Sequence, residues 1–182
     1  MAKTNDKKKV ITGKVRLCYP RLFKAEAFGD GQEAKYSVCI LIPEDDKKTL
    51  AKINNAVEAA KEEGISSKWG GKEPKKLKLP LRDGEERDGE EYEGMYFLNA
   101  SSTRKPGVID RDHQEIIDPE EIYPGCYGRV SLNFYPFDSN GNRGIAVGLN
   151  NVQKLADGER LGGSVSSAEE DFDDDWEDDD DF

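Results

Sequence analysis

The stretch CYGRVSLNFYPFDSNGNRGIAVGLNNVQKL, residues 126–155, decides the fold of this chain. Its first half alternates between two kinds of residue, and this period of two is typical of a β-strand with one face in a core. The inward face would carry Gly128, Val130, Leu132 and Phe134, and the outward face Tyr127, Arg129, Ser131, Asn133 and Tyr135. The segment DSNGN contains Asn-Gly, which tolerates positive φ and favours a turn. We therefore expect residues 126–137 and 143–155 to pair as a long antiparallel hairpin.

Three further stretches have strand character: VITGKVRLCY (10–19), AKYSVCILI (34–42) and GMYFLNA (94–100). Alternation along each stretch assigns its two faces. In the first, Val15, Leu17 and Tyr19 should point inward and Lys14, Arg16 and Cys18 outward; in the second, Tyr36, Val38, Ile40 and Ile42 should point inward. The first strand would thus have a basic outer face.

The segment EDDKKTLAKINNAVEAAKEEG, residues 44–64, predicts the one helix. Its apolar residues Leu50, Ile53, Val57 and Ala60 recur at helical spacing, acids occupy the opening turn, and Gly64 is placed to end it. Residues 65–93 are polar and should form a long, partly mobile connection.

Five strands and one helix predict a mainly β fold. A five-stranded OB-type barrel fits this count, and so does a small mixed α+β domain. In the OB reading the helix follows the second clear strand, whereas a simple OB barrel has it after the third. Either two strands flank Gly29–Gly31, or the barrel is elaborated. The domain should span residues 10–161, with a basic arm at 1–9 and a linker and acidic tail at 162–182.

The charge of the chain is concentrated at its end. Formal net charge is −11, but residues 169–182 hold eleven acids and no base, which leaves 27 acidic against 27 basic residues elsewhere. The body is therefore neutral, and a basic nucleic-acid-binding face remains compatible with the overall composition. High charge and few apolar residues predict that the tail is disordered in isolation.

Several classes of protein find no support in the sequence. The cysteines Cys18, Cys39 and Cys126 are odd in number and widely spaced, which favours reduced, buried thiols in a cytosolic protein. No apolar run is long enough for a membrane span, and phosphate-binding glycine motifs are missing. The single histidine, His113, lies in a charged loop without a nucleophile context. We expect no catalysis, cofactor or metal, although the carboxylates at 83–93 and 110–121 leave a metal-dependent nuclease as a distant alternative.

The outward face of residues 127–135 suits a single nucleic-acid strand. Two tyrosines flank an arginine and small polar groups, and rings of this kind stack on bases while the arginine neutralises phosphate. The alternative, that Tyr127 and Tyr135 only cover the barrel, is equally compatible with the pattern. Further candidate contacts are Lys14, Arg16, Arg104, Lys105 and Arg111, together with the lysines of the arm.

Three segments resemble a known family: CYPRLF (18–23), NASSTRKP (99–106) and AVGLNNVQKLADGERLGG (146–163). They are similar to the phage and prophage single-stranded-DNA-binding proteins first catalogued as a domain of unknown function. The resemblance covers residues 10–182 and implies an OB-fold that binds single-stranded DNA during replication and recombination, in the cytoplasm of a bacterial host. It is compatible with a homodimer.

The tail DFDDDWEDDDDF adds aromatic residues to its acids: Phe172, Trp176 and the terminal Phe182. We expect the acids to compete with DNA for the basic groove, and the aromatic residues to provide anchors for replication or recombination proteins. An alternative from another class is an acidic-tailed chaperone or DNA mimic that sequesters a basic protein.

Overall fold

The computed structural model describes residues 7–27, 31, 33–87, 89–139 and 141–161, and it is mainly β with one α-helix, as predicted. The strands are β1 Lys9–Ile11, β2 Val15–Glu26, β3 Lys35–Pro43, β4 Leu77–Lys78, β5 Arg82–Asp83, β6 Met95–Ser102, β7 Gly107–Ile109, β8 Tyr127–Ser139 and β9 Asn142–Ala156. The helix α1 spans Lys47–Ser67, and three short 3₁₀ turns lie at Gly84–Glu86 (η2), Glu90–Tyr92 (η3) and Pro119–Glu121 (η4).

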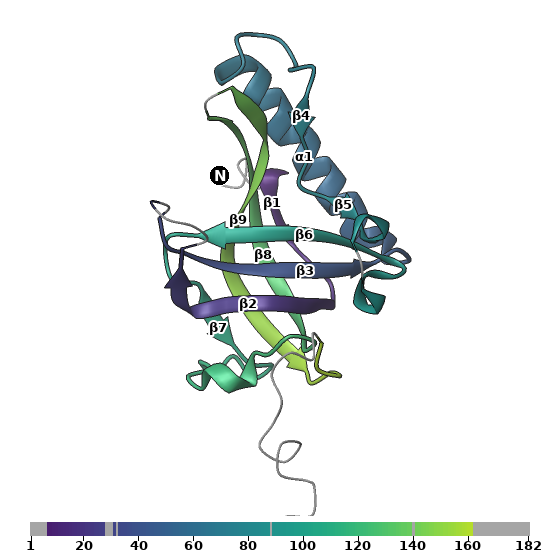
Figure 1. Ribbon diagram of the computed structural model, residues 1–182, viewed down its shortest axis with the longest axis vertical. Coiled ribbons are helices and arrows are strands. Elements are labelled where there is room, and N and C mark those ends of the chain that lie inside the picture. Colours follow the sequence, from purple (N-terminus) through teal and green to yellow (C-terminus); the bar gives the residue numbers. More distant parts are fainter. Residues whose placement is uncertain (1–6, 28–30, 32, 88, 140, 162–182) are drawn as a thin grey trace, which may run out of the picture.

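The five strands of eight or more residues close into a barrel. Its order is β2–β3–β6–β9–β8, and β8 closes the ring by pairing with β2. The β6–β9 pairing is parallel and the other four are antiparallel, which is a Greek-key barrel of the OB type. In Figure 1, β2, β3 and β6 run side by side across the molecule, and β8 and β9 cross behind them.

The predicted hairpin is confirmed. β8 and β9 pair in antiparallel register from Tyr127↔Ala156 to Ser139↔Asn142. The inward residues of β8 are buried as expected, and Phe134 is fully enclosed. Gly128 is needed here because a Cβ at this position would lie 2.6 Å from the carbonyl oxygen of Gln153. The sequence pattern therefore places the core side of the hairpin correctly.

The first predicted strand is two strands. β1 ends at Ile11 and β2 begins at Val15, and between them the buried Thr12 accepts a hydrogen bond from the backbone N–H of Val130. The expected alternation then fails at its end, because the register against β3 shifts after Cys18. Tyr19 takes φ of 47° and is 49% exposed, whereas Cys18 is buried. The inward prediction for Tyr19 is therefore wrong, whereas Cys18 points away from the barrel core, as predicted, and is buried there by a second cluster.

A second small core explains why Cys18 is buried. Cys18, Cys39, Leu41, Tyr92 and Phe97 form a cluster on the outer side of β2, β3 and β6. Cys18 and Cys39 are register partners on adjacent strands, and all three cysteines of the chain are free and buried, as predicted. The hydrogen bond between the two thiols, together with burial, raises the pKa of Cys39, while the same bond lowers the pKa of Cys18.

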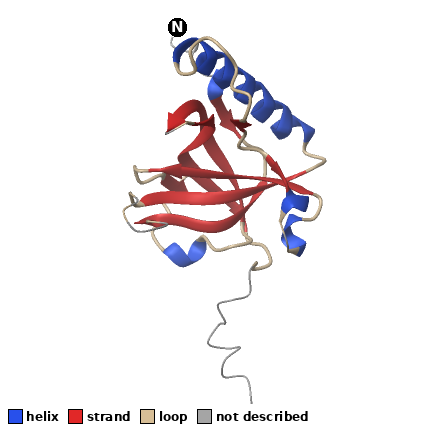
Figure 2. Ribbon diagram, turned by 45° about the horizontal axis from the view of Figure 1, so that its top comes forward, coloured by secondary structure: helices blue, strands red, loops and turns tan. Residues whose placement is uncertain are grey.

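The helix lies across one end of the barrel and contacts β8, β1 and β9 (Figure 2). Its N-terminus is capped by Asp46, whose carboxylate accepts from the N–H of Thr49 at 3.2 Å. Leu50, Ile53, Val57 and Ala60 are buried as predicted. In chain order α1 falls between the second and third barrel strands, β3 and β6. The barrel is therefore an elaborated OB-fold.

The sequence pattern predicted that Gly64 ends the helix. This prediction is wrong, because α1 continues to Ser67. Gly64 instead leaves room for Trp69, whose ring lies where a Cβ of residue 64 would be, at 2.6–2.8 Å. The indole N–H of Trp69 donates to the carbonyl of Phe137 at 3.1 Å and fixes the ring against the hairpin. The long connection predicted for residues 65–93 contributes Trp69 and Tyr92 to the two cores and contains β4, β5 and two short turns.

We predict that Gly64→Ala lowers the free energy of unfolding by about 1–2 kcal/mol, although alanine favours a helix by about 1 kcal/mol over glycine. The added methyl group would collide with a tryptophan that is held by a hydrogen bond. Asn55→Ala, at an exposed position of the same helix, is the matched control and should not destabilise the protein. Urea denaturation measures both variants. A Gly64→Ala protein as stable as the wild type would show that Trp69 is not held against this helix.

Candidate nucleic-acid interface

The outward face of β8 is extended on both sides by neighbouring strands. β1 pairs with it through Lys9↔Asn133 and Ile11↔Ser131, and β9 pairs with it through Asn133↔Gly148 and Ser131↔Asn151. Residues directly opposite one another in an antiparallel pair project from the same face. One surface of the sheet therefore carries Lys9, Ile11 and Asn151 beside the alternating polar residues of β8.

The middle of this surface is hollowed into a groove of about 440 Å³, which we call the polar groove. It is lined by Lys9, Ser102, Arg104, Lys105, Asn133, Leu149, Asn150 and Asn151. Three of these residues are cationic, and none is acidic. The groove is therefore a place where negative charge is favoured.

The loop that joins β6 to β7 brings Arg104 and Lys105 to the groove. The N–H of Arg104 donates to Ser102 Oγ at 3.0 Å, and the N–H of Gly107 donates to Asn151 Oδ1 at 3.1 Å. β7 then runs parallel to β9 with Gly107 beside Asn151. Both ends of the loop are thus tied down, while the side chains of Arg104 and Lys105 stay exposed.

A smaller apolar hollow of about 100 Å³ continues the polar groove along β8. Its lining consists of Ile11, Ile109, Arg129, Val130, Ser131, Asn151, Val152 and Gln153. Asn151 lines both depressions, so they are adjacent. Arg129 is exposed, and its Nε donates to the carbonyl of Thr12 at 3.1 Å, which holds the side chain across the gap between β1 and β2.

Tyr135 lies two residues beyond Asn133 on the same face, and it is 42% exposed. Its ring passes over Gly148 of β9, where the position of a Cβ would be 3.6 Å from the ring. A flat ring with a free face is suited to stacking on a base. The structure thus brings Arg104, Lys105, Arg129 and Tyr135 of the predicted residues to one surface.

Tyr127, Lys14 and Arg16 form a separate cluster at the other end of β8. The Nζ of Lys14 lies 4.8 Å, and the Cζ of Arg16 5.4 Å, from the centroid of the Tyr127 ring. Arg16 also donates to the carbonyls of Gly125 and Glu159, at 3.1 and 2.5 Å. Arg16 and Tyr127 are half-buried in these contacts, so they tie the end of the barrel together, whereas Lys14 is exposed.

Arg111 is not brought to the polar groove. It lies in the loop after β7, in a hollow of about 240 Å³ shared with Asp110, Asp112, Lys154 and Asp157. The hydrogen bond from Lys154, at 2.6 Å, lowers the pKa of Asp157. Burial acts to lower the pKa of Lys154, but its bond to Asp157 leaves that pKa raised. Both groups stay charged near neutral pH, and the acids offset the positive charge of this hollow.

Two of the three amides that line the groove, Asn150 and Asn151, were not predicted from the sequence. Asn150 and Asn151 belong to the LNNVQKL segment that carries the family resemblance, and the segment itself is the signal that could have identified them. Lys9 had been assigned to the arm, but it starts β1 and lines the groove. Lys8 next to it pairs with Glu63 of α1. The tail residues Phe172, Trp176 and Phe182 lie outside the described residues.

The outer face of β3 and β6 is the nucleic-acid surface of many OB-folds. Here one end of that face is covered by η3 and the residues before it. The Tyr92 ring meets Phe97 edge-on at 5.4 Å between centroids, and the Cζ of Arg87 lies 5.0 Å from the Phe97 ring centroid. This covering reduces the exposed part of the β3–β6 face, whereas the polar groove on the β1–β8–β9 surface is open.

Neither a membrane-spanning helix nor a metal-binding cluster is found among the described residues. None of their helices is long and apolar enough to cross a membrane. No group of three or more His, Cys, Asp or Glu side chains in this part of the chain is arranged to hold a metal ion.

Comparison with known proteins decides the family. The family model described as "Enterobacter phage Enc34, ssDNA-binding protein" matches residues 8–182. The chain belongs to this family. A curated relative, "Putative protein p50" of Acyrthosiphon pisum secondary endosymbiont phage 1, is 33% identical over 177 residues, which is 91% of this chain and 93% of the relative. The resemblance found in the sequence is thereby confirmed.

Solved structures agree with the barrel. The single-stranded DNA-binding protein from bacteriophage Enc34, in complex with ssDNA, is similar with a TM-score of 0.75 and 28% identity, over 85% of this chain and 90% of that chain. The bacteriophage T7 single-stranded DNA binding protein gp2.5 shares the fold, with a TM-score of 0.60 at 16% identity, over 89% of this chain and 99% of that chain. The family model and the Enc34 structure both describe DNA-binding proteins, which agrees with the expectation that the chain is not an enzyme.

Proposed function

We propose that this chain binds single-stranded DNA, without sequence preference, across the polar groove and the outward face of β8. The observation that carries the proposal is the groove itself, where Lys9, Arg104 and Lys105 meet amide side chains in a depression without an acid. The Enc34 relative, solved in complex with ssDNA, supports the same class of ligand.

The groove offers separate contacts for the two parts of a nucleotide. Its lysines and arginine face the phosphates, and neutralising them releases counterions, which makes binding depend on salt. Tyr135, Arg129 and the exposed Ile11 provide surfaces against which bases stack or pack. Amides such as Asn151 both donate and accept hydrogen bonds, so they tolerate any base edge. Affinity without sequence preference follows from this combination.

The remaining predicted residues act at the margins of this surface. Lys14 adds exposed positive charge beyond Arg129, and Arg16 with Tyr127 holds the strand ends that position it. Arg111 contributes least, because acids surround it. The DNA path thus runs from the β6–β7 loop along β8 toward Lys14.

The acidic tail regulates this surface in our proposal. Its eleven acids imitate a polyanion and compete with weakly bound strands, and DNA displaces the tail toward partner proteins. Phe172, Trp176 and Phe182 supply apolar anchors, so that replication or recombination proteins recognise more than charge. The protein would act in the cytoplasm of the host bacterium, where a phage replicates its DNA.

The groove makes a quantitative prediction for salt dependence. Replacing Arg104 and Lys105 together by Ala should lower the slope of log affinity against log salt by about 1.4, since each single-strand phosphate contact contributes about 0.7. Tyr135→Ala should weaken binding roughly tenfold with an unchanged slope, because stacking carries no charge. Fluorescence anisotropy of labelled oligo-dT over a series of salt concentrations measures both effects.

Two matched variants control these measurements. Lys72→Ala removes an exposed lysine from the loop after α1 and should change neither slope nor affinity measurably, while Tyr135→Phe keeps the ring and should bind as the wild type does. If all groove variants bind like Lys72→Ala, the DNA uses another face of the barrel.

The tail proposal predicts the behaviour of a chain that ends at Ala168. This form should bind oligo-dT more tightly than the full chain at low salt, and the difference should shrink as salt screens the tail. Equal affinities would contradict competition by the tail. Absence of strand binding by both forms would instead favour the acidic-tailed chaperone or DNA mimic, and Mg²⁺-dependent degradation of the oligonucleotide would favour a nuclease.

A further inference from the structure

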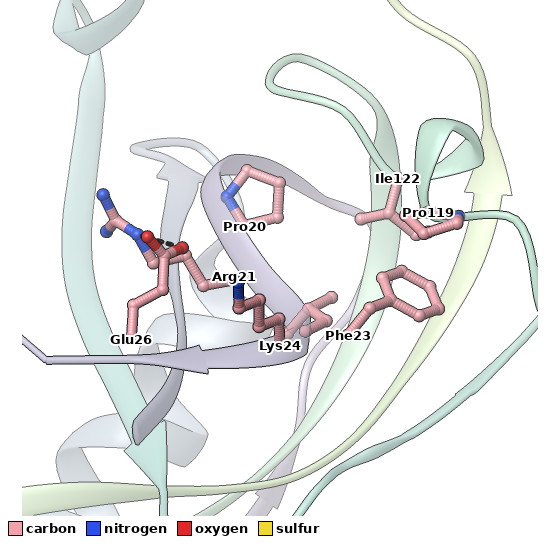
Figure 3. A pocket seen from close by; sticks show the side chains of 8 residues that line it. Pro20, Arg21, Phe23, Lys24, Glu26, Pro119 and Ile122 are labelled. Carbon is pink, nitrogen blue, oxygen red and sulfur yellow. Dashed lines mark hydrogen bonds and ion pairs between the residues drawn. The ribbon is translucent and has the colours of Figure 1, made fainter. Parts of the chain in front are cut away.

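A pocket of about 150 Å³ lies on β2, beyond the bulge at Tyr19. Its lining, shown in Figure 3, consists of Pro20, Arg21, Leu22, Phe23, Lys24, Glu26, Pro119 and Ile122. The last two come from η4 and the residue that follows it. We call this depression the Phe23 pocket.

The walls of the Phe23 pocket are apolar and firmly held. Phe23 is half-buried and packs against the barrel core, of which Ile122 and Leu22 are buried members. In Figure 3 the ring of Phe23 lies beside Pro119 and Ile122. Flat and ring-shaped side chains therefore form the wall of an open depression on the protein surface.

The rim of the pocket is basic. Arg21 and Lys24 lie in its lining, and the Nζ of Lys105 is 6.0 Å from the centroid of the Phe23 ring. Glu26 is the single acid among the lining residues, and it is paired with Arg21 at 3.0 Å. An apolar slot with cations around its mouth matches a base with its flanking phosphates.

Lys105 connects the pocket to the polar groove. The same side chain lines the groove and lies over the Phe23 ring. A strand that follows the groove past Lys105 therefore reaches the Phe23 side of the pocket. None of the residues that line the pocket lies on the outward face of β8 or was among the predicted contact residues.

We propose that the Phe23 pocket receives one pyrimidine base of the bound strand, stacked on Phe23, with the neighbouring phosphates held by Lys24 and Lys105. This inference rests on the proposed binding of single-stranded DNA. A cavity of about 150 Å³ holds a ring of the size of benzene, so a pyrimidine fits more readily than a purine. The site thus adds a modest preference for pyrimidine runs to binding that is otherwise independent of sequence.

Photocrosslinking of the full chain tests the proposal. An oligo-dT in which single positions carry 5-iododeoxyuridine is irradiated in complex with the protein, and mass spectrometry locates the adducts. We expect an adduct on Phe23. Phe23→Leu, which keeps an apolar side chain, should lose that adduct and weaken oligo-dT binding about tenfold, with a smaller effect on oligo-dA. Phe23→Tyr keeps a ring and should retain the adduct and the affinity for oligo-dT. Thermal unfolding establishes that the variants are folded.

The remaining outcomes overturn the proposal in distinguishable ways. Adducts confined to Tyr135 or other groove residues, with unchanged binding by Phe23→Leu, would remove the pocket and leave the proposed function intact. No binding of any oligonucleotide would remove both. If Phe23→Leu alters oligo-dT affinity only in the full chain and not in the form ending at Ala168, the pocket holds the chain's own tail instead of a base.

Discussion

The pairing of β8 with β9 is the interaction on which the rest of the structure depends. β8 also pairs with β1 and β2, and β9 also pairs with β4, β6 and β7, so three of the five pairings that form the barrel involve this hairpin. A change of register by one residue would turn Val130, Leu132 and Phe134 outward and remove the core. Register in the hairpin therefore fixes the barrel and the outer surface together.

This dependence links stability to the proposed function. The same alternation that buries Phe134 exposes Asn133 and Tyr135 on the opposite face. Neighbouring strands then add Lys9 from β1 and Asn151 from β9 by pairing alone. Backbone hydrogen bonds hold the β-strands that carry these groups, so the groove is formed before a ligand arrives. A preformed groove limits the ordering cost of binding.

Features that depend on the spacing of residues along one segment could be predicted from the sequence. Features that depend on contacts between distant segments could not. The hairpin, its two faces and the buried helix positions such as Ile53 were predictable because each follows from spacing along one segment. Tyr19 was assigned to the wrong face because a bulge shifts the register of β2 after Cys18, and no single-strand pattern reveals a bulge. Gly64 was expected to end α1 because glycine commonly ends a helix. Its actual role, to make room for Trp69, was not visible because Trp69 lies in a stretch dominated by polar residues.

The residues of the candidate site also fall into those that one strand pattern predicts and those that only tertiary pairing places. Arg129 and Tyr135 were predictable, since both lie on the alternating strand. Lys9 was not, because only the pairing of β1 with β8 places it on the groove. Arg111 was grouped with the basic residues by its sequence position, but the fold surrounds it with Asp110, Asp112 and Asp157. Basic residues in a sequence thus indicate that the partner is a nucleic acid, whereas the pairing of the strands decides which of these residues share one surface.

We propose that single-stranded DNA binds the β1–β8–β9 surface and not the partly covered outer face of β3 and β6. Two-dimensional ¹H–¹⁵N NMR of the full chain, titrated with oligo-dT, tests this most directly, because side-chain amides report contact individually. Binding at this surface should give the largest shifts for the side-chain amides of Asn133, Asn150 and Asn151 and for the backbone of residues 102–107. Shifts concentrated instead at Ser37, Asn99 and Ser101, with the groove amides unmoved, would contradict it.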